Sequence, residues 1–180
     1  SRRSRLTAAR SWAGNPGNSF SPPGQWSEIA QRVSQADGNS LDADVKLFFA
    51  VGQALLDASI AVWDAKRAYD SVRPITAIRH YYRDVWIRAW SGPGRQPPAA
   101  MPGATWNPYQ RFIRPSPPFA EFPSGHSAFS AAASTTIAAL RGSDVFALSD
   151  TLRAGDIGFD VSVPAVPVTL THATLSSAAA

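Results

Sequence analysis

Residues 41–71 read LDADVKLFFAVGQALLDASIAVWDAKRAYDS. Apolar and small side chains recur there every three or four residues, which predicts the buried face of one long helix. The residues on this predicted face are Val45, Phe48, Phe49, Gly52, Leu55, Leu56, Ser59, Val62 and Trp63. Asn39 or Ser40 can cap its start, and Pro74 stops it because proline disfavours the helical conformation at the preceding residue. This helix, continued by one turn, carries Lys66 on the same face.

The segments on either side of this helix predict an all-α fold, a helical bundle. Further helices are expected at Trp26–Ser34, Ile75–Trp90 and Ser124–Leu140, and another is expected to begin near Leu170. A proline-rich loop is expected over residues 91–123, and irregular chain or short strands over residues 143–167. We therefore divide the chain into an extended N-terminal arm, residues 1–40, and a partial helical domain, residues 41–180.

Composition excludes several classes of protein. The chain has 180 residues, 44% of them hydrophobic, enough for one domain with a core. It has no cysteine, which excludes disulfides and thiolate ligands. The net charge of +4 comes largely from an arginine-rich N-terminus without a nucleic-acid-binding signature, so we expect no nucleic-acid partner.

The sequence also bears on location and assembly. No apolar run approaches the roughly 20 residues of a membrane span, and no signal peptide opens the chain. The compartment stays open, with a secreted or periplasmic location favoured over a cytoplasmic one. The oligomeric state stays open as well, a homo-oligomer included.

Lys66 and Arg73 are seven residues apart, which is nearly two turns of a helix. At that spacing a lysine and an arginine point to about the same side, and their long side chains can converge on one anion with several oxygens. The alternative is an ordinary cation at a helix end, paired with Asp64 or Asp70.

A second motif, Pro123-Ser124-Gly125-His126, lies where the proline-rich loop becomes a helix. Helix N-termini present unpaired N–H groups to anions, and Ser124 adds a hydroxyl. Gly125 lets the backbone approach an oxygen closely. His126 has the side chain whose ordinary pKa suits proton transfer near neutrality. The alternative is a helix cap followed by an incidental histidine.

The two motifs together, Lys66, six residues, Arg73-Pro74 and later Pro123-Ser124-Gly125-His126, resemble the superfamily of vanadium-dependent haloperoxidases and type 2 phosphatidic acid phosphatases. The flanking sequences AVWDAK, residues 61–66, and PPFAEFPSGH, residues 117–126, are similar to the soluble haloperoxidase branch. The resemblance covers about residues 20–180.

This resemblance implies a cofactor, substrates and a role for each motif residue. Vanadate would be the cofactor, and hydrogen peroxide and halide the substrates, giving hypohalous acid. Contacts to the vanadate oxygens would come from Lys66, Arg73, the Ser124 hydroxyl and the Gly125 amide. His126 would be the catalytic acid–base residue, and Trp63 and Phe119 would line the halide pocket.

A third family motif, Ser-Arg, five residues, His, three residues, Asp, does not occur in this chain. Its histidine is the covalent vanadium ligand, so no metal ligand is assigned here. His172 and His80 lack this context and are interpreted as structural or surface residues. We therefore expect a truncated chain, an incomplete bundle of poor stability, and weak or absent vanadate binding. The alternatives are a soluble acid phosphatase acting on a phosphate ester, or an inactive fragment.

Overall fold

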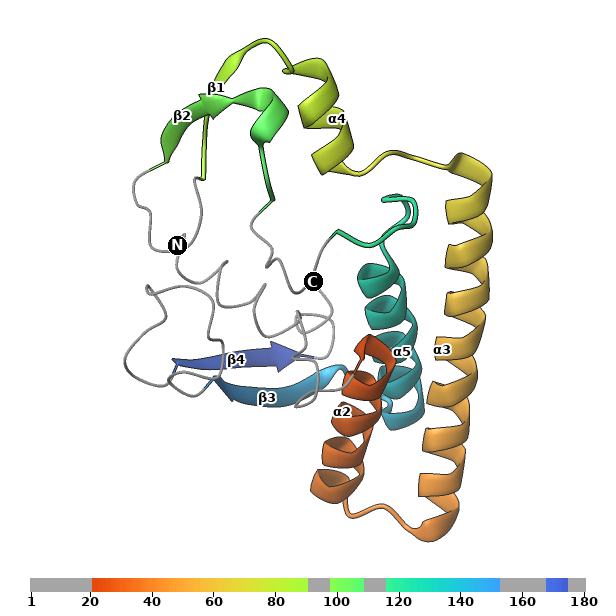
Figure 1. The fold of residues 1–180 in the computed structure, drawn as a ribbon. Coiled ribbons are helices and arrows are strands. Elements are labelled where there is room, and N and C mark those ends of the chain that lie inside the picture. The colour runs from red at the N-terminus through yellow and green to blue at the C-terminus, as the bar shows by residue number, and fades with distance from the viewer. Residues whose placement is uncertain (1–20, 91–97, 109–115, 153–167, 175–180) are drawn as a thin grey trace. The chain divides into compact units, whose positions relative to one another are not determined.

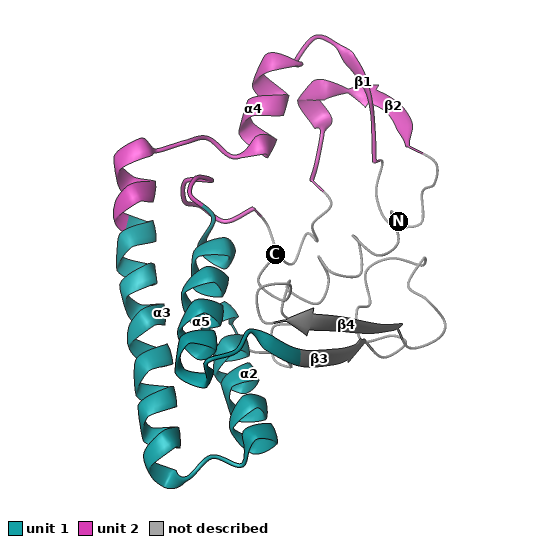
Figure 2. Ribbon diagram, turned by 180° about the vertical axis from the view of Figure 1, so that it is seen from behind, with its two compact units in different colours: residues 1–63, 124–156, 165–180 teal, residues 64–123, 157–164 magenta. Residues whose placement is uncertain are grey.

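The computed structural model, which describes residues 21–90, 98–108, 116–152 and 168–174, is mostly helical, as the sequence predicts. The helices labelled in Figure 1 are α2 (Pro22–Asp37), α3 (Leu41–Tyr69), α4 (Pro74–Tyr81) and α5 (Gly125–Arg141), with a short 3-10 helix at Gly103–Thr105. The strands are β1 (Trp86–Ala89), β2 (Ala99–Pro102), β3 (Val145–Leu152) and β4 (Val168–Thr174). Figure 2 colours two compact units: residues 1–63, 124–156 and 165–180 form one, and residues 64–123 and 157–164 the other.

The core of the first unit lies among α2, α3 and α5, which run side by side in Figure 1. Its buried residues are Trp26, Ala30, Val33, Leu47, Val51, Leu55, Phe129, Ala133 and Ile137. The Trp26 indole N–H donates to the Ser130 hydroxyl oxygen at 3.0 Å, so its polar atom is satisfied inside the core. Residues 22–37, at the end of the predicted N-terminal arm, are therefore part of the core, and residues 1–20 lie outside the described residues.

Local sequence signals set the helix ends. Pro22 occupies the first turn of α2, and Gly38, with φ of 64°, ends it in the left-handed conformation that glycine adopts at little cost. The Ser40 hydroxyl accepts the Ala43 N–H at 3.3 Å at the start of α3, which confirms one of the two predicted caps. Gly142, with φ of 69°, ends α5 in the same way as Gly38 ends α2.

The predicted buried face of α3 is largely wrong. Of the predicted apolar and small residues only Leu55 and Val62 are buried, and Lys66, predicted on the same face, is buried as well. The buried stripe also contains Leu47 and Val51, which were not predicted. The large apolar residues predicted to be buried but exposed are Val45, Phe48, Phe49, Leu56 and Trp63. The helix is apolar over two adjoining faces, and within the described residues α2 and α5 cover one of them.

One helical stretch among the described residues, 41–81, is long and apolar enough to cross a membrane by length and composition, contrary to the expectation from the sequence. This is weak evidence for a span, because the core helix of a water-soluble protein meets the same criterion. Leu47, Val51 and Leu55 of α3 are buried in the core, while 22% of the apolar window as a whole is buried.

One predicted helix is confirmed only in its first half, and another is replaced by a strand. The helix expected at Ile75–Trp90 ends as α4 at Tyr81, and β1 then pairs antiparallel with β2, Trp86 opposite Pro102. The helix expected near Leu170 is β4, which pairs antiparallel with β3. β1 contains Trp86 and Ile87, and β4 contains Val168 and three threonines. Aromatic and β-branched residues favour strands over helices, and the spacing of short apolar runs does not tell a strand from a helix.

Gly103 allows the chain after β2 to pass against the end of α4. A Cβ atom there would lie 2.1 Å from the Tyr82 carbonyl oxygen and 2.8 Å from its carbonyl carbon. The Gly103 N–H also donates to the Val85 carbonyl at 2.9 Å, so the backbone cannot simply retreat.

We therefore expect Gly103→Ala to lower the free energy of unfolding of this unit by about 1–3 kcal/mol, the usual cost of overpacking. Hydrogen exchange of the β1 and β2 amides measures it. Gly52→Ala is the control, because nothing lies within 4 Å of a Cβ at Gly52. Equal exchange in the two variants would contradict the prediction.

Candidate functional site

Lys66 and Arg73 both bind the backbone of the segment before the Pro-Ser-Gly-His motif. Their predicted place on one helix is wrong, because α3 ends at Tyr69 and Arg73 is the N-cap of α4. Their convergence on an anion stays a prediction. Lys66 Nζ donates to the carbonyl oxygens of Ala120 and Glu121 at 2.8 and 3.0 Å. Arg73 Nε donates to the Phe119 carbonyl at 2.8 Å, and its Nη2 donates to the Ala120 carbonyl at 3.4 Å. The two cations therefore share one carbonyl oxygen as an acceptor.

The Phe119 ring lies against both cations. Its centroid is 5.3 Å from Lys66 Nζ and 4.8 Å from Arg73 Cζ, distances at which a cation is attracted to an aromatic face. Phe119 is 41% exposed, so the ring covers the cations on one side and meets solvent on the other. The predicted aromatic residue is thus next to the predicted cations.

Lys66 is a buried charge, with 4% of its surface exposed. Burial, and then the Arg73 charge, lower the pKa of Lys66, and the charge of Glu121 offsets this only in part. Carbonyl oxygens solvate a cation but bring no net charge. Two cationic side chains, Lys66 and Arg73, therefore lie close together at this segment, and we call them the cationic cluster.

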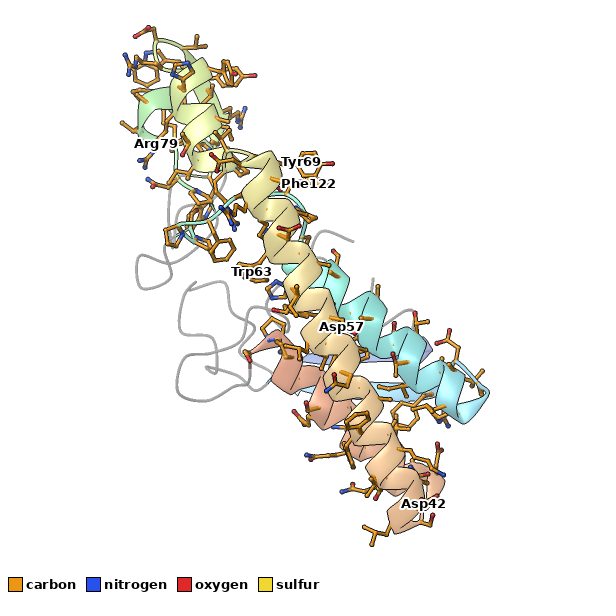
Figure 3. The ribbon with its side chains drawn as sticks, turned by 90° about the vertical axis from the view of Figure 1, so that its right-hand side faces the viewer. Asp42, Asp57, Trp63, Tyr69, Arg79 and Phe122 are labelled. Atoms are coloured by element: carbon orange, nitrogen blue, oxygen red, sulfur yellow. The ribbon has the colours of Figure 1, made fainter. Side chains whose placement is uncertain are left out.

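Ser71, between the two cations, was not predicted as a site residue. Its carbonyl oxygen accepts the Glu121 N–H at 3.1 Å, and its hydroxyl oxygen accepts the Phe122 N–H at 2.8 Å. Figure 3 shows Tyr69, two residues earlier, beside Phe122, and their rings meet edge to face at 5.6 Å. Contacts with a segment some fifty residues away leave no signature in local spacing, so sequence reasoning could not find them.

The other predicted residues lie at the start of α5, in the first unit. Ser124 is the N-cap, and its hydroxyl oxygen accepts the Ser127 N–H at 3.3 Å, which confirms the helix cap of the alternative interpretation. Gly125 and His126 are the first two residues of the helix, and His126 is exposed. Their amides belong to the helix N-terminus, where N–H groups lack carbonyl partners within the helix.

Trp63 packs against Gly125. A Cβ on Gly125 would lie 3.5 Å from the Trp63 ring, and the Trp63 and Phe129 ring centroids are 6.3 Å apart. Thus α3 contributes Trp63 to this cluster and Lys66 to the cationic one. The structure brings together Lys66, Arg73 and Phe119, and separately Trp63 and Gly125. The pairing of Trp63 with Phe119 as a halide pocket stays a prediction.

The sequence matches the profile of the VCPO second helical-bundle domain over residues 46–180. The chain therefore belongs to the vanadium haloperoxidase superfamily. No curated protein matches it.

Solved structures agree with this assignment. The apo-type bacterial vanadium-dependent chloroperoxidase is 28% identical with a TM-score of 0.65, over 73% of this chain and 28% of that one. The holo-type enzyme is 25% identical with a TM-score of 0.70, over 88% and 33%. The first bacterial vanadium-dependent iodoperoxidase is 25% identical with a TM-score of 0.67, over 96% and 34%. The chain thus spans about a third of the length of these relatives.

The ammonium and guanidinium donors of Lys66 and Arg73 are of the kind that binds oxyanions. A compact ammonium and a planar guanidinium on one side of a loop suit an anion with several oxygens. Among the described residues, no three histidine, cysteine, aspartate or glutamate side chains form a group that could hold a metal ion. Oxygen atoms of an oxyanion, rather than a bare cation, are what this cluster can bind.

Proposed function

We propose that this chain supplies oxyanion-binding residues of a vanadium-dependent haloperoxidase, which oxidises halide with hydrogen peroxide to hypohalous acid and water. The observation that carries the proposal is the convergence of the buried Lys66 ammonium and the Arg73 guanidinium on the backbone carbonyls of Phe119 to Glu121. Membership of the superfamily favours vanadate as the anion, and vanadate, when bound, would supply the oxidation of halide by peroxide.

Each residue would have the role that its functional group allows. Lys66 and Arg73 would bind vanadate oxygens through charge-assisted hydrogen bonds. The Ser124 hydroxyl and the Gly125 amide would add neutral donors at a helix N-terminus. His126 would donate and accept the protons that the reaction consumes and releases. Trp63 and Phe119 would give the halide a weakly hydrated, aromatic surface.

The test is halogenation of a dye by the complete protein with vanadate, hydrogen peroxide and bromide, chloride or iodide in turn. We expect halide-dependent product that requires both vanadate and peroxide. Phosphate-ester hydrolysis without vanadate, and no halogenation with any of the three halides, would contradict the proposal and indicate a phosphatase.

Gly125 provides a sharper test, because packing does not demand a glycine there. An added Cβ would be in ordinary contact with the Trp63 ring at 3.5 Å, and alanine is a better helix former than glycine. We expect Gly125→Ala to leave the melting temperature unchanged or raised. Its Cβ would keep a vanadate oxygen from approaching the Gly125 amide closely, so vanadate binding by the complete protein should weaken about tenfold, roughly the value of one hydrogen bond to a charged group.

Calorimetric titration with vanadate and thermal unfolding measure the two effects. Gly52→Ala, which adds a methyl group to an exposed position on α3, is the matched control. Unchanged vanadate affinity in Gly125→Ala would remove the Gly125 amide from the proposed site.

A further inference from the structure

Ser71 makes two hydrogen bonds whose geometry bears directly on Lys66. The N–H of Glu121 shares a peptide unit with the carbonyl of Ala120, and the N–H of Phe122 shares one with the carbonyl of Glu121. The Ser71 backbone carbonyl oxygen accepts the Glu121 N–H, and the Ser71 hydroxyl oxygen accepts the Phe122 N–H. Lys66 Nζ donates to both carbonyl oxygens. Ser71 and Lys66 thus hold opposite ends of the same two peptide units.

Such an arrangement has a mechanical consequence. The N–H and C=O of a trans peptide unit lie in one plane and point in opposite directions. Neither of these two peptide units is the cis one, which joins Phe122 to Pro123. Fixing their N–H groups on Ser71 therefore fixes the direction of their carbonyl oxygens.

The position of Ser71 depends on how α3 ends. Asp70 has φ of 40°, a left-handed conformation, and its N–H still donates to the Lys66 carbonyl at 3.0 Å. The chain leaves the helix at this residue, and Ser71 follows directly. Aspartate is among the residues that adopt this conformation with least strain.

We propose that Ser71 is a positioning residue, whose hydroxyl aims the Glu121 carbonyl at Lys66, beside the Ala120 carbonyl that the Ser71 backbone holds, and so sets where the Lys66 ammonium meets an oxyanion. This inference rests on the proposed function, because it assigns Ser71 a role through the lysine that would bind vanadate. Ser71 itself does not contact the anion in this account.

The reactivity of Lys66 can be measured against one other lysine, because Lys46 and Lys66 are the only lysines in the sequence. Lys46 is exposed on α3 and pairs with Asp42 at 2.7 Å, so it serves as a reference within the same molecule. Amine acylation, read at each lysine by mass spectrometry, gives a Lys66-to-Lys46 ratio that reports on how Lys66 is held. Titration with inorganic phosphate, followed at the lysine Cε–Hε signals, gives the anion affinity.

We expect Ser71→Ala to raise the acylation ratio and to weaken phosphate binding about threefold to tenfold, the range for losing one neutral hydrogen bond. Ser71→Thr, which keeps the hydroxyl, should restore both values towards those of the wild type. Ser27→Ala, which removes a hydroxyl that bonds only within the first turns of α2, is the control.

The outcomes separate the two proposals. If Ser71→Ala keeps the wild-type acylation ratio, or if Ser71→Thr behaves like Ser71→Ala, Ser71 does not position Lys66. Suppose that neither the wild-type chain nor the complete protein binds phosphate or vanadate, while the Lys66-to-Lys46 acylation ratio still rises in Ser71→Ala. The proposed function then fails, and the positioning of Lys66 by Ser71 stands.

Discussion

Replacing Lys66 by methionine is expected to weaken phosphate or vanadate binding by about 10- to 100-fold. The change removes a hydrogen-bond donor that carries a charge, a contribution of about 1.5–3 kcal/mol. Methionine keeps the length of an unbranched side chain, so the buried stripe of α3 stays filled. Titration of the chain with inorganic phosphate, and of the complete protein with vanadate, measures the loss.

Lys46→Met is the matched control. Lys46 lies on the same helix, is exposed, and forms an exposed ion pair with Asp42 of the kind that contributes little to stability. Both variants lose one positive charge, so a general electrostatic effect would weaken binding equally in both. Equal losses would show that Lys66 has no special role.

The same lysine predicts the pH dependence. The folded pKa of Lys66 lies below its ordinary value of 10.5, because burial and Arg73 disfavour the ammonium. Above that folded pKa the amine is neutral and attracts an anion less. We therefore expect phosphate affinity to fall as pH rises through the folded pKa, and this alkaline loss to be absent in Lys66→Met.

Trp26→Ala is expected to have the largest effect on stability, a loss of about 3–5 kcal/mol in the free energy of unfolding. Trp26, on α2, is fully buried, and its indole N–H donates to the Ser130 hydroxyl on α5. Its replacement by alanine leaves a cavity and removes the donor to the buried Ser130 hydroxyl. A whole domain typically has about 5–15 kcal/mol of stability. Urea unfolding followed by circular dichroism measures the change.

Trp86→Ala provides the comparison, because Trp86 in β1 is 71% exposed. Surface substitutions usually change stability by about 0.5 kcal/mol or less. A loss at Trp86 as large as that at Trp26 would mean that the core does not lie where α2, α3 and α5 place it.

Helices with strong end signals could be predicted from the sequence, but the face that each helix buries could not. Ser124 and Gly142 mark the ends of α5, and Pro74 marks the start of α4. In contrast, α3 is apolar over two faces, and a period of 3.6 identifies apolar faces without saying which one a neighbour covers. Burial of Leu47 and exposure of Phe49 depend on α2 and α5, which are distant in sequence.

The candidate site divides in the same way. Charged and titratable side chains carry their chemistry in the sequence, so Lys66, Arg73 and His126 could be predicted as site residues from spacing and family resemblance. The carbonyl oxygens of Phe119 to Glu121 and the hydroxyl of Ser71 could not, because every residue has a carbonyl and serines are common. Only tertiary structure shows which backbone atoms face the cations.

The most direct test is the pKa of Lys66 with and without inorganic phosphate, read from its Cε–Hε signals with Lys46 as the internal reference. An anion that binds the ammonium favours its charged form and must raise the pKa. We predict a Lys66 pKa below the ordinary 10.5 in the complete protein without anion, and a saturable rise on addition of phosphate. A Lys66 pKa that stays the same at every phosphate concentration would contradict the account.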